Sequence, residues 1–314
     1  MQSHNTVALI LKPKPKPKIS RRRLSLFMMV VPLLLLVIVF NYVPLFGWVY
    51  AFFKYKPGIP LSETPFAGLE YFRLLFGANS DIGNVLKNTL VMSFLNILTS
   101  PIPIVFAILL SELRGQKLKK FIQTITTVPY FISWIIVFSL VFSIFSFEGI
   151  FNTLLMQFGL IKDPINVLGN PSTAWYVQTA IVIWKSTGWS AIIYFAAIAG
   201  LDSQLFDAAK IDGAGRFRCI WHVTLPGLMP TFIVLLLLNV SNMLSNGFDQ
   251  FFVFYNPMVA DKLEVLDYYI YRVAFHGNDY PFATAVGMWK TLISIVLLFT
   301  VNKLAKKIRG QSII

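Results

Sequence analysis

The stretch LSLFMMVVPLLLLVIVFNYVPLFGWVYAFF, Leu24–Phe53, runs for thirty positions without a charged residue. A helix that crosses the roughly 30 Å hydrocarbon core of a membrane needs about 20 mostly apolar residues. The apolar residues here are continuous and do not alternate with polar ones. Because lipid offers the backbone no hydrogen bonds, this pattern predicts a membrane-spanning helix and not a barrel strand.

Five further stretches have the same character. They are Asn88–Ser111, Phe121–Phe147, Thr173–Gly200, Gly227–Phe248 and Pro281–Val301. The sequence therefore predicts an all-α integral membrane protein, with six transmembrane helices in residues 24–301. Of the 314 residues, 56% are hydrophobic and 13% are charged, against about 25% charged in soluble domains. This composition excludes a soluble enzyme and a disordered protein, and the single Cys219 excludes an intrachain disulfide.

The distribution of Lys and Arg predicts the orientation. A Lys/Pro-rich arm, residues 1–23, has seven basic residues and no acidic one, and the tail 302–314 has four and none. With the loops after spans two and four, these segments hold 18 basic and 4 acidic residues, whereas the alternate loops hold 7 and 10. Because basic loops stay in the cytoplasm, both termini are predicted to be cytoplasmic. The net charge of +13 is then explained by the orientation of the chain in a lipid membrane, and we expect no contact with nucleic acid.

Patterns that would indicate catalysis on this chain are missing from the sequence. It has no G-x-x-x-x-G-K-[ST] phosphate loop, no cluster of metal ligands and no recognisable Ser/His/Asp arrangement. We therefore expect no catalytic residue, no metal and no cofactor on the chain itself. A secondary, ion-coupled transporter is an alternative, but no Asp or Glu lies in the central part of any predicted span. A membrane anchor or sensor without transport activity is a second alternative.

The loop between predicted spans four and five, residues 201–226, has the pattern of a short helix. Asp202 or Ser203 can cap its start, and Gly213 can adopt the left-handed conformation that ends it. A second short amphipathic helix can follow, before Pro226 opens the fifth span. The loop either lies at the lipid surface or presents a short exposed helix to a partner protein.

The motif Asp207-Ala-Ala-Lys-Ile-Asp-Gly-Ala214, followed by Leu225-Pro226, resembles the EAA loop of ABC importer permeases. The family pattern is Glu-Ala-Ala, three residues, Gly, and a downstream Leu-Pro; here Asp replaces the Glu, with the same charge and a shorter reach. The resemblance implies a coupling helix, residues 203–214, that docks on an ATPase subunit. The residues it assigns to that contact are Asp207, Ala208, Ala209, Lys210, Asp212, Gly213 and Ala214.

Other segments are similar to the LplB-type polysaccharide permeases. They are residues 239–251, 255–257, 269–272, 283–290 and 302–307, while residues 66–72 resemble the outer segment that follows span one in sugar permeases. The resemblance implies the type I ABC importer permease fold and uptake of oligo- or polysaccharides across a bacterial cytoplasmic membrane. It also implies three kinds of partner: an extracellular sugar-binding lipoprotein, a second homologous permease that forms a heterodimer, and two ATPase subunits. Those ATPase subunits, and not this chain, would bind ATP and Mg.

Polar residues inside the fifth span suggest a translocation path. Asn239, Asn242 and Asn246 recur at i, i+3 and i+7, which predicts one face of a helix. They either hydrogen-bond neighbouring helices or contact sugar hydroxyls, for which an amide offers both donor and acceptor. In the sugar permeases that this chain resembles, the corresponding helix contributes to the sugar site.

Two lysines within predicted spans are flanked by tryptophans. Lys185 lies between Trp184 and Trp189, and Lys290 follows Trp289. A lysine at the bilayer centre costs about 2.5–3.5 kcal/mol, so both should face the interior of the bundle. Each lysine would bind a carbonyl or carboxylate across a helix interface, or an acidic sugar. The tryptophans would stack on sugar rings or serve as packing, and we include all five residues in the predicted path.

Overall fold

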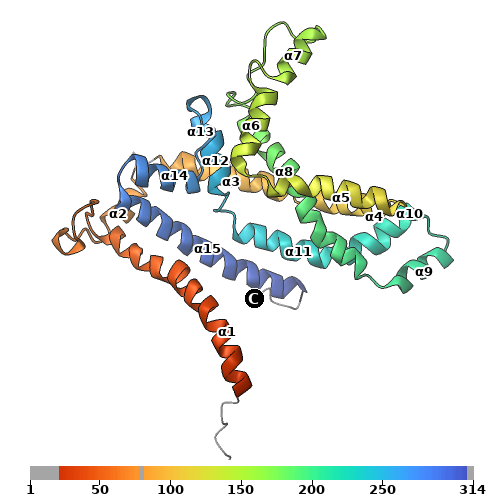
Figure 1. The fold of residues 1–314 in the computed structure, drawn as a ribbon, viewed down its shortest axis with the longest axis horizontal. Helices are drawn as coiled ribbons and strands as arrows, with labels where there is room; N and C mark the ends of the chain where they lie inside the picture. Colours follow the sequence, from red (N-terminus) through yellow and green to blue (C-terminus); the bar gives the residue numbers. More distant parts are fainter. Residues whose placement is uncertain (1–20, 78–80, 310–314) are drawn as a thin grey trace, which may run out of the picture. The chain divides into compact units, whose positions relative to one another are not determined.

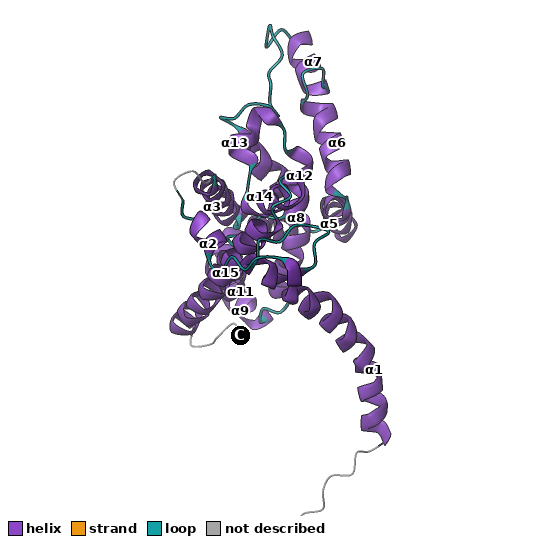
Figure 2. Cartoon of the chain, turned by 90° about the vertical axis from the view of Figure 1, so that its left-hand side faces the viewer, coloured by secondary structure: helices purple, strands orange, loops and turns teal. Residues whose placement is uncertain are grey.

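The computed structural model describes residues 21–77 and 81–309. In that part of the chain the backbone is helical apart from loops, with a single isolated bridge between Phe53 and Phe66 (Figure 2). Six helical segments are long and apolar enough to cross a membrane, which confirms the predicted number of spans. They are Ser25–Phe52, Ile82–Ser111, Trp134–Gln157, Ala174–Ala199, Arg216–Ser241 and Tyr280–Lys307.

The helices follow one another along the chain as Figure 1 labels them. They are α1 Arg21–Val37, α2 Glu70–Leu74, α3 Ile82–Thr99, α4 Ile102–Ser111, α5 Gln116–Phe131, α6 Trp134–Phe145, α7 Ile150–Gln157, α8 Ala174–Ala199, α9 Ser203–Ile211, α10 Arg216–Cys219, α11 Leu225–Ser241, α12 Phe248–Phe254, α13 Ala260–Leu263, α14 Leu266–Tyr271 and α15 Tyr280–Arg309. The last helix extends beyond the predicted sixth span into the basic tail, of which residues 310–314 lie outside the described part.

The chain divides into two compact units, Met1–Val49 and Tyr50–Ile314. In the first unit, α1 continues through a π-helical turn, Ile38–Tyr42, into a 3-10 helix that begins at Val43. The predicted basic arm, residues 1–23, lies outside the described residues except for the start of α1 at Arg21.

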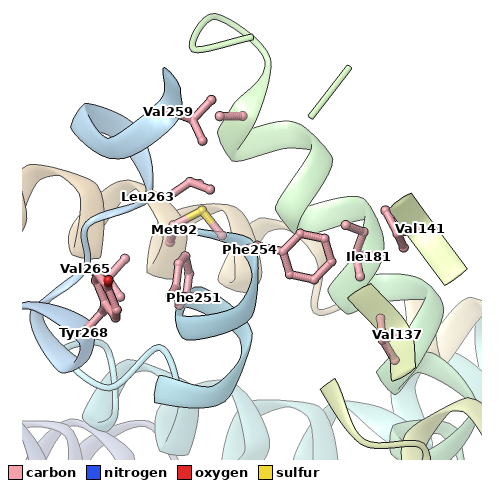
Figure 3. Close-up of a cluster of buried hydrophobic side chains, with 11 residues drawn as sticks. Met92, Val137, Val141, Ile181, Phe251, Phe254, Val259, Leu263, Val265 and Tyr268 are labelled. Atoms are coloured by element: carbon pink, nitrogen blue, oxygen red, sulfur yellow. The ribbon is translucent and has the colours of Figure 1, made fainter. Parts of the chain in front are cut away.

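The second unit has three clusters of buried apolar side chains. The first joins α3, α6, α8 and α12–α14, with Met92, Phe251 and Leu263 near its middle (Figure 3). The second joins α3, α14 and α15, and the third joins α4, α8 and α11. The helices α3, α8 and α14 each contribute to two of the clusters and so connect them.

The third predicted span, Phe121–Phe147, is wrong as a continuous helix. The chain breaks between α5 and α6, where Ile132 and Ser133 adopt extended conformations with ψ of 135° and 152°. In Figure 1 the two helices leave this break in different directions. The apolar span begins at Trp134 and continues through α7. Pro129, which lacks a backbone N–H, lies just before the break.

The fifth predicted span, Gly227–Phe248, is also wrong at its end. Helix α11 stops at Ser241, and a turn through Asn242–Gly247 leads to the short α12. Asn242 caps the helix end with its own side chain, because its Nδ2 donates to the Leu238 carbonyl at 3.0 Å. Gly247, with φ of 88°, adopts the left-handed region that favours glycine.

The loop between α8 and α11 differs from prediction in one respect. The second short helix is not separate, because α10, a π-helical turn at Ile220–Thr224 and α11 run on without a break. Residues of that stretch, such as Phe217, therefore lie on the first turns of the fifth span. The π turn lies just before Pro226, where the regular hydrogen-bond pattern loses a donor.

Candidate functional site

A cavity of about 350 Å³ lies between α3, α8 and the end of α11. Its described lining contains no charged side chain but many hydroxyl and amide groups. From α3 and its end these are Ser93, Asn96, Thr99 and Ser100, and from α8 they are Ser186, Thr187 and Ser190. The cavity is therefore suited to a ligand that exchanges hydrogen bonds with neutral groups.

Three polar oxygens of this lining are buried without a hydrogen-bond partner. They are the Oδ1 atoms of Asn96 and Asn246 and the Oγ of Ser100. A buried polar atom that lacks a partner costs about 1–3 kcal/mol. Three such atoms on one cavity indicate a ligand or ordered water that donates hydrogen bonds to them.

The three asparagines predicted on one helix face do meet at this cavity, but not for the predicted reason. Asn239 lies on α11, Asn242 is the residue just after it, and Asn246 lies in the turn before α12. The turn brings Asn246 back toward α3, where its Nδ2 donates to Ser93 Oγ at 2.9 Å. The site therefore combines the two alternatives, a contact between elements and a cavity lining.

The residues of α3 at the cavity were missed in the sequence, although a signal was available. Ser93, Asn96 and Ser100 stand at i, i+3 and i+7, the same spacing as the three asparagines. Hydroxyl residues commonly bond to their own helix in apolar segments, which makes them weak indicators alone. The repetition of the spacing in two spans is the stronger indication of a shared polar face.

Lys185 does not line the cavity described above but faces the break between α5 and α6. Its side chain is 7% exposed, and its Nζ donates to the carbonyls of Pro129 and Tyr130, each at 2.9 Å, and of Ile132. They lie at the end of α5, where carbonyls begin to lose their helical partners, although the Pro129 carbonyl also accepts from the Ile132 N–H at 3.2 Å. Of the partners expected for Lys185, backbone carbonyls across a helix interface are thus the ones found. The lysine caps the C-terminal end of α5.

Lys290 has a carboxylate partner instead. It forms an ion pair with Asp267 of α14, and the two side chains are 17% and 16% exposed. The other oxygen of Asp267 accepts a hydrogen bond from the backbone N–H of Gly247 at 3.1 Å. Both lysines are therefore engaged by the protein itself.

The three tryptophans of the predicted path lie away from the lining of this cavity, among the residues described. Trp189 stacks on Tyr130 with ring centroids 4.6 Å apart. Trp289 meets Phe76 edge to face at 6.2 Å, and Trp184 is half-exposed. The ring contacts of Trp189 and Trp289 are those of packing residues.

The loop helix α9 begins and ends as the sequence predicts. Asp202 caps its start by accepting from the Gln204 N–H at 2.9 Å. Gly213 has φ of 73°, which confirms the left-handed turn. On the helix, Lys210 and Asp207 form an exposed ion pair at 3.0 Å.

Around this helix the largest exposed groups are apolar. Ile211 and Phe217 are 87% and 90% exposed, on either side of the Gly213 turn. Of the other predicted contact residues, Ala208 and Asp212 are exposed, while Ala209 and Ala214 are partly covered. These two side chains suit either alternative drawn from the sequence, contact with the lipid surface or contact with a partner protein.

A second polar cluster joins α13 and α14 to the start of α3. Arg272 pairs with Glu264 and lies 3.8 Å from Asp81. Burial raises the pKa of Glu264, and Arg272 opposes this only in part. Burial acts to lower the pKa of Arg272, but the hydrogen bond and charge of Glu264 outweigh it and raise that pKa. Arg272 is thus held by carboxylates of the protein itself and is not free to bind a ligand.

Comparisons with known proteins agree with this architecture. YteP of Bacillus subtilis (strain 168), a polygalacturonan/rhamnogalacturonan transport system permease protein, is 39% identical over 88% of this chain and 86% of its own length. Protein LplB of the same organism is 37% identical over 86% of this chain and 85% of its own.

Solved structures give the same result. Two crystal structures of a bacterial ABC transporter for the acidic polysaccharide alginate, one in complex with an alginate pentasaccharide-bound periplasmic protein, contain a similar chain. Each has a TM-score of 0.82, with 32% and 31% identity, and covers 92% and 93% of this chain and 97% of the other.

Residues 100–310 match the family described as the binding-protein-dependent transport system inner membrane component. This match takes in α4 to α15, with both the loop helix and most of the cavity. Together with six apolar spans, it places the chain in the inner membrane as a multi-pass protein. The chain belongs to this family of ABC transporter permeases.

Proposed function

We propose that the chain carries oligosaccharides through the membrane in an ATP-driven importer, and that the sugar passes through the cavity between α3, α8 and α11. The observation that carries the proposal is the set of three buried, unpartnered oxygens on Asn96, Ser100 and Asn246. Sugar hydroxyls can donate to all three, and neighbouring amide groups can donate in return. The ion-coupled transporter considered from the sequence is set aside, because the family is one of binding-protein-dependent systems.

The names of the relatives favour fragments of acidic polysaccharides as substrates. YteP is named for polygalacturonan and rhamnogalacturonan, and the similar crystal structures belong to an alginate transporter. The cavity of this chain, however, has an uncharged lining in the described residues, and Lys185 and Lys290 have partners within the protein. We therefore infer that this subunit contacts the hydroxyl groups of such a sugar and not its carboxylates.

The partners follow from the family and from the exposed surfaces. An extracellular binding lipoprotein would deliver the sugar, as the complex of the alginate transporter with its periplasmic protein suggests. A second, homologous permease would complete the path. Two ATPase subunits would bind ATP and Mg, while this chain would bind no cofactor. Helix α9 and residues up to Ala214 would dock on one ATPase, with Ile211 and Phe217 as its apolar contacts.

Replacement of Asn96 tests the cavity. Asn96→Leu should lower oligosaccharide uptake by reconstituted importer about two- to twelvefold, since one hydrogen bond to a neutral hydroxyl contributes roughly 0.5–1.5 kcal/mol. ATP hydrolysis stimulated by the loaded binding protein should persist. The matched control is Asn84→Leu on the same helix, whose amide bonds to the Asp261 carbonyl away from the cavity. Equal loss in both variants would contradict the assignment.

Two glycines of one loop test the docking helix. Gly213→Val places a β-branched residue at φ of 73°, so the turn should distort. Gly215→Val is its control, because Gly215 has φ of −72° and open space around it. We expect Gly213→Val to abolish uptake and binding-protein-stimulated ATPase activity, and Gly215→Val to retain both. Wild-type ATPase stimulation in Gly213→Val would overturn the assignment of α9 as the coupling helix.

The predicted topology accompanies this proposal, with both termini and α9 in the cytoplasm. Ser203 is exposed at the start of α9. With Cys219 replaced by serine, Ser203→Cys should react with a membrane-impermeant maleimide in inside-out vesicles and not in intact cells. Labelling in intact cells would reverse the orientation.

A further inference from the structure

We propose that Asp267 and Lys290 are positioning residues for the polar cavity. Their ion pair joins α14 to α15, and it fixes the turn that carries Asn246 between α11 and α12. The inference rests on the proposed function for the role of the cavity, but the geometry of the turn can be tested without it.

The first step is the contact between the ion pair and the turn. One carboxylate oxygen of Asp267 binds Lys290, and the other accepts the backbone N–H of Gly247 at 3.1 Å. A carboxylate accepts stronger hydrogen bonds than a neutral group does. The ion pair therefore holds the backbone of the turn at Gly247, where φ is 88°.

The second step leads from Gly247 to the cavity. The adjacent residue, Asn246, donates to Ser93 Oγ at 2.9 Å, and Ser93 in turn donates to the Met243 carbonyl. The Oδ1 of Asn246 is left buried and unpartnered among the lining residues. A shift of the turn would thus move Asn246 and break its contact with α3.

The third step concerns the charges. Both side chains of the pair are largely buried, and each has the other as its partner. The amine of Lys290 is therefore not free to bind an acidic sugar, which was one of the two roles expected from the sequence. Its contribution to transport passes through Asp267 and the turn, without contact with the substrate.

A cross-link between α3 and the turn measures the position of the turn directly. In the full chain with Cys219→Ser, the pair Ser93→Cys and Asn246→Cys replaces two side chains that are in contact. Oxidation should form a disulfide rapidly in the otherwise native protein. Adding Asp267→Asn and Lys290→Met removes both charges together, and should slow the cross-link roughly tenfold because the turn loses its charged acceptor.

Two further variants separate positioning from stability. Lys54→Met with Glu70→Gln neutralises another ion pair, 2.8 Å long and exposed, and should leave the cross-linking rate unchanged. Asp267→Glu keeps the charge but lengthens the side chain by one methylene, so it should slow the cross-link while the melting temperature stays the same. Lys290→Arg retains a cationic partner for the Asp267 carboxylate, so its cross-linking rate should equal the native rate.

Uptake by the importer, with Ser93 and Asn246 intact, gives the functional reading. The doubly neutral variant should lose uptake while ATP hydrolysis stimulated by the loaded binding protein persists. Native cross-linking rates in both the doubly neutral and the Asp267→Glu variants would overturn the inference. If the wild-type importer takes up no oligosaccharide and the cross-link still responds, the proposed function fails while the positioning role stands.

Discussion

The break between α5 and α6 and the break between α11 and α12 are each held by one lysine, but in different ways. At the first, Lys185 donates directly to the carbonyls of Pro129, Tyr130 and Ile132 at the end of α5. At the second, Lys290 binds Asp267, whose other oxygen accepts from Gly247. One break exposes acceptors, which a cation satisfies. The other exposes a donor, which requires a carboxylate between it and the lysine.

The two breaks also differ in what surrounds them. The first is packed against α8 and aromatic rings, and Lys185 lies 5.3 Å from the Trp134 ring centroid. The second opens on the polar cavity, with Asn242 and Asn246 on its turn. In both places a lysine inside one span lies next to a break in the helical backbone of another segment. Only the second break presents residues to a cavity. We expect stability to depend on the first and transport on the second.

The largest effect is expected from Lys185→Met. Three carbonyls would lose a charged donor at once, so the free energy of unfolding should fall by about 3 kcal/mol or more. Thermal melting of the purified complex in detergent measures this loss. Lys120→Met, at an exposed position of α5, is the control and should melt like the wild type. Unchanged melting in Lys185→Met would mean that the break does not need its lysine.

A smaller effect is expected from Gly188→Ala, which tests the packing beside the same break. A Cβ at Gly188 would collide with the Thr126 carbonyl of α5, because α5 and α8 cross closely there. Overpacking of this kind costs about 1–3 kcal/mol. Gly287→Ala on α15 is the matched control, since its Cβ would meet no atom within 4 Å. Equal melting temperatures for the two variants would remove this contact from the comparison.

The smallest effect, with the opposite sign on stability, is expected from Ser100→Ala in the cavity. It removes a buried hydroxyl that has no partner, so the folded protein should gain about 1 kcal/mol. Oligosaccharide uptake should fall at the same time, because the group is kept for a ligand. Ser111→Ala removes a hydroxyl bonded to Ile108 at 2.7 Å and should gain no stability. A destabilised Ser100→Ala would show that the hydroxyl has a structural partner.

Local features of the sequence determined a large part of this protein. Long uninterrupted apolar runs predict six spans, because a helix in lipid must satisfy its own backbone. Asp202 predicts the start of α9 and Gly213 its end, because a side-chain cap and a left-handed turn depend on neighbouring residues alone. The EAA-like motif indicated the family for the same reason, as one short stretch holds it.

Only the tertiary structure decided where two spans break and which polar groups meet. The partners of Lys185 lie 53 to 56 residues away from it, and those of Asp267 lie 20 and 23 residues away on either side. The spacing of residues along the chain carries no information about such distant pairs. For the same reason the asparagines were predicted to share one helix face, although in the structure a turn brings them together. The reason is that a helix in a membrane can be interrupted only where another element satisfies the freed backbone groups, and that element is known only once the chain is folded.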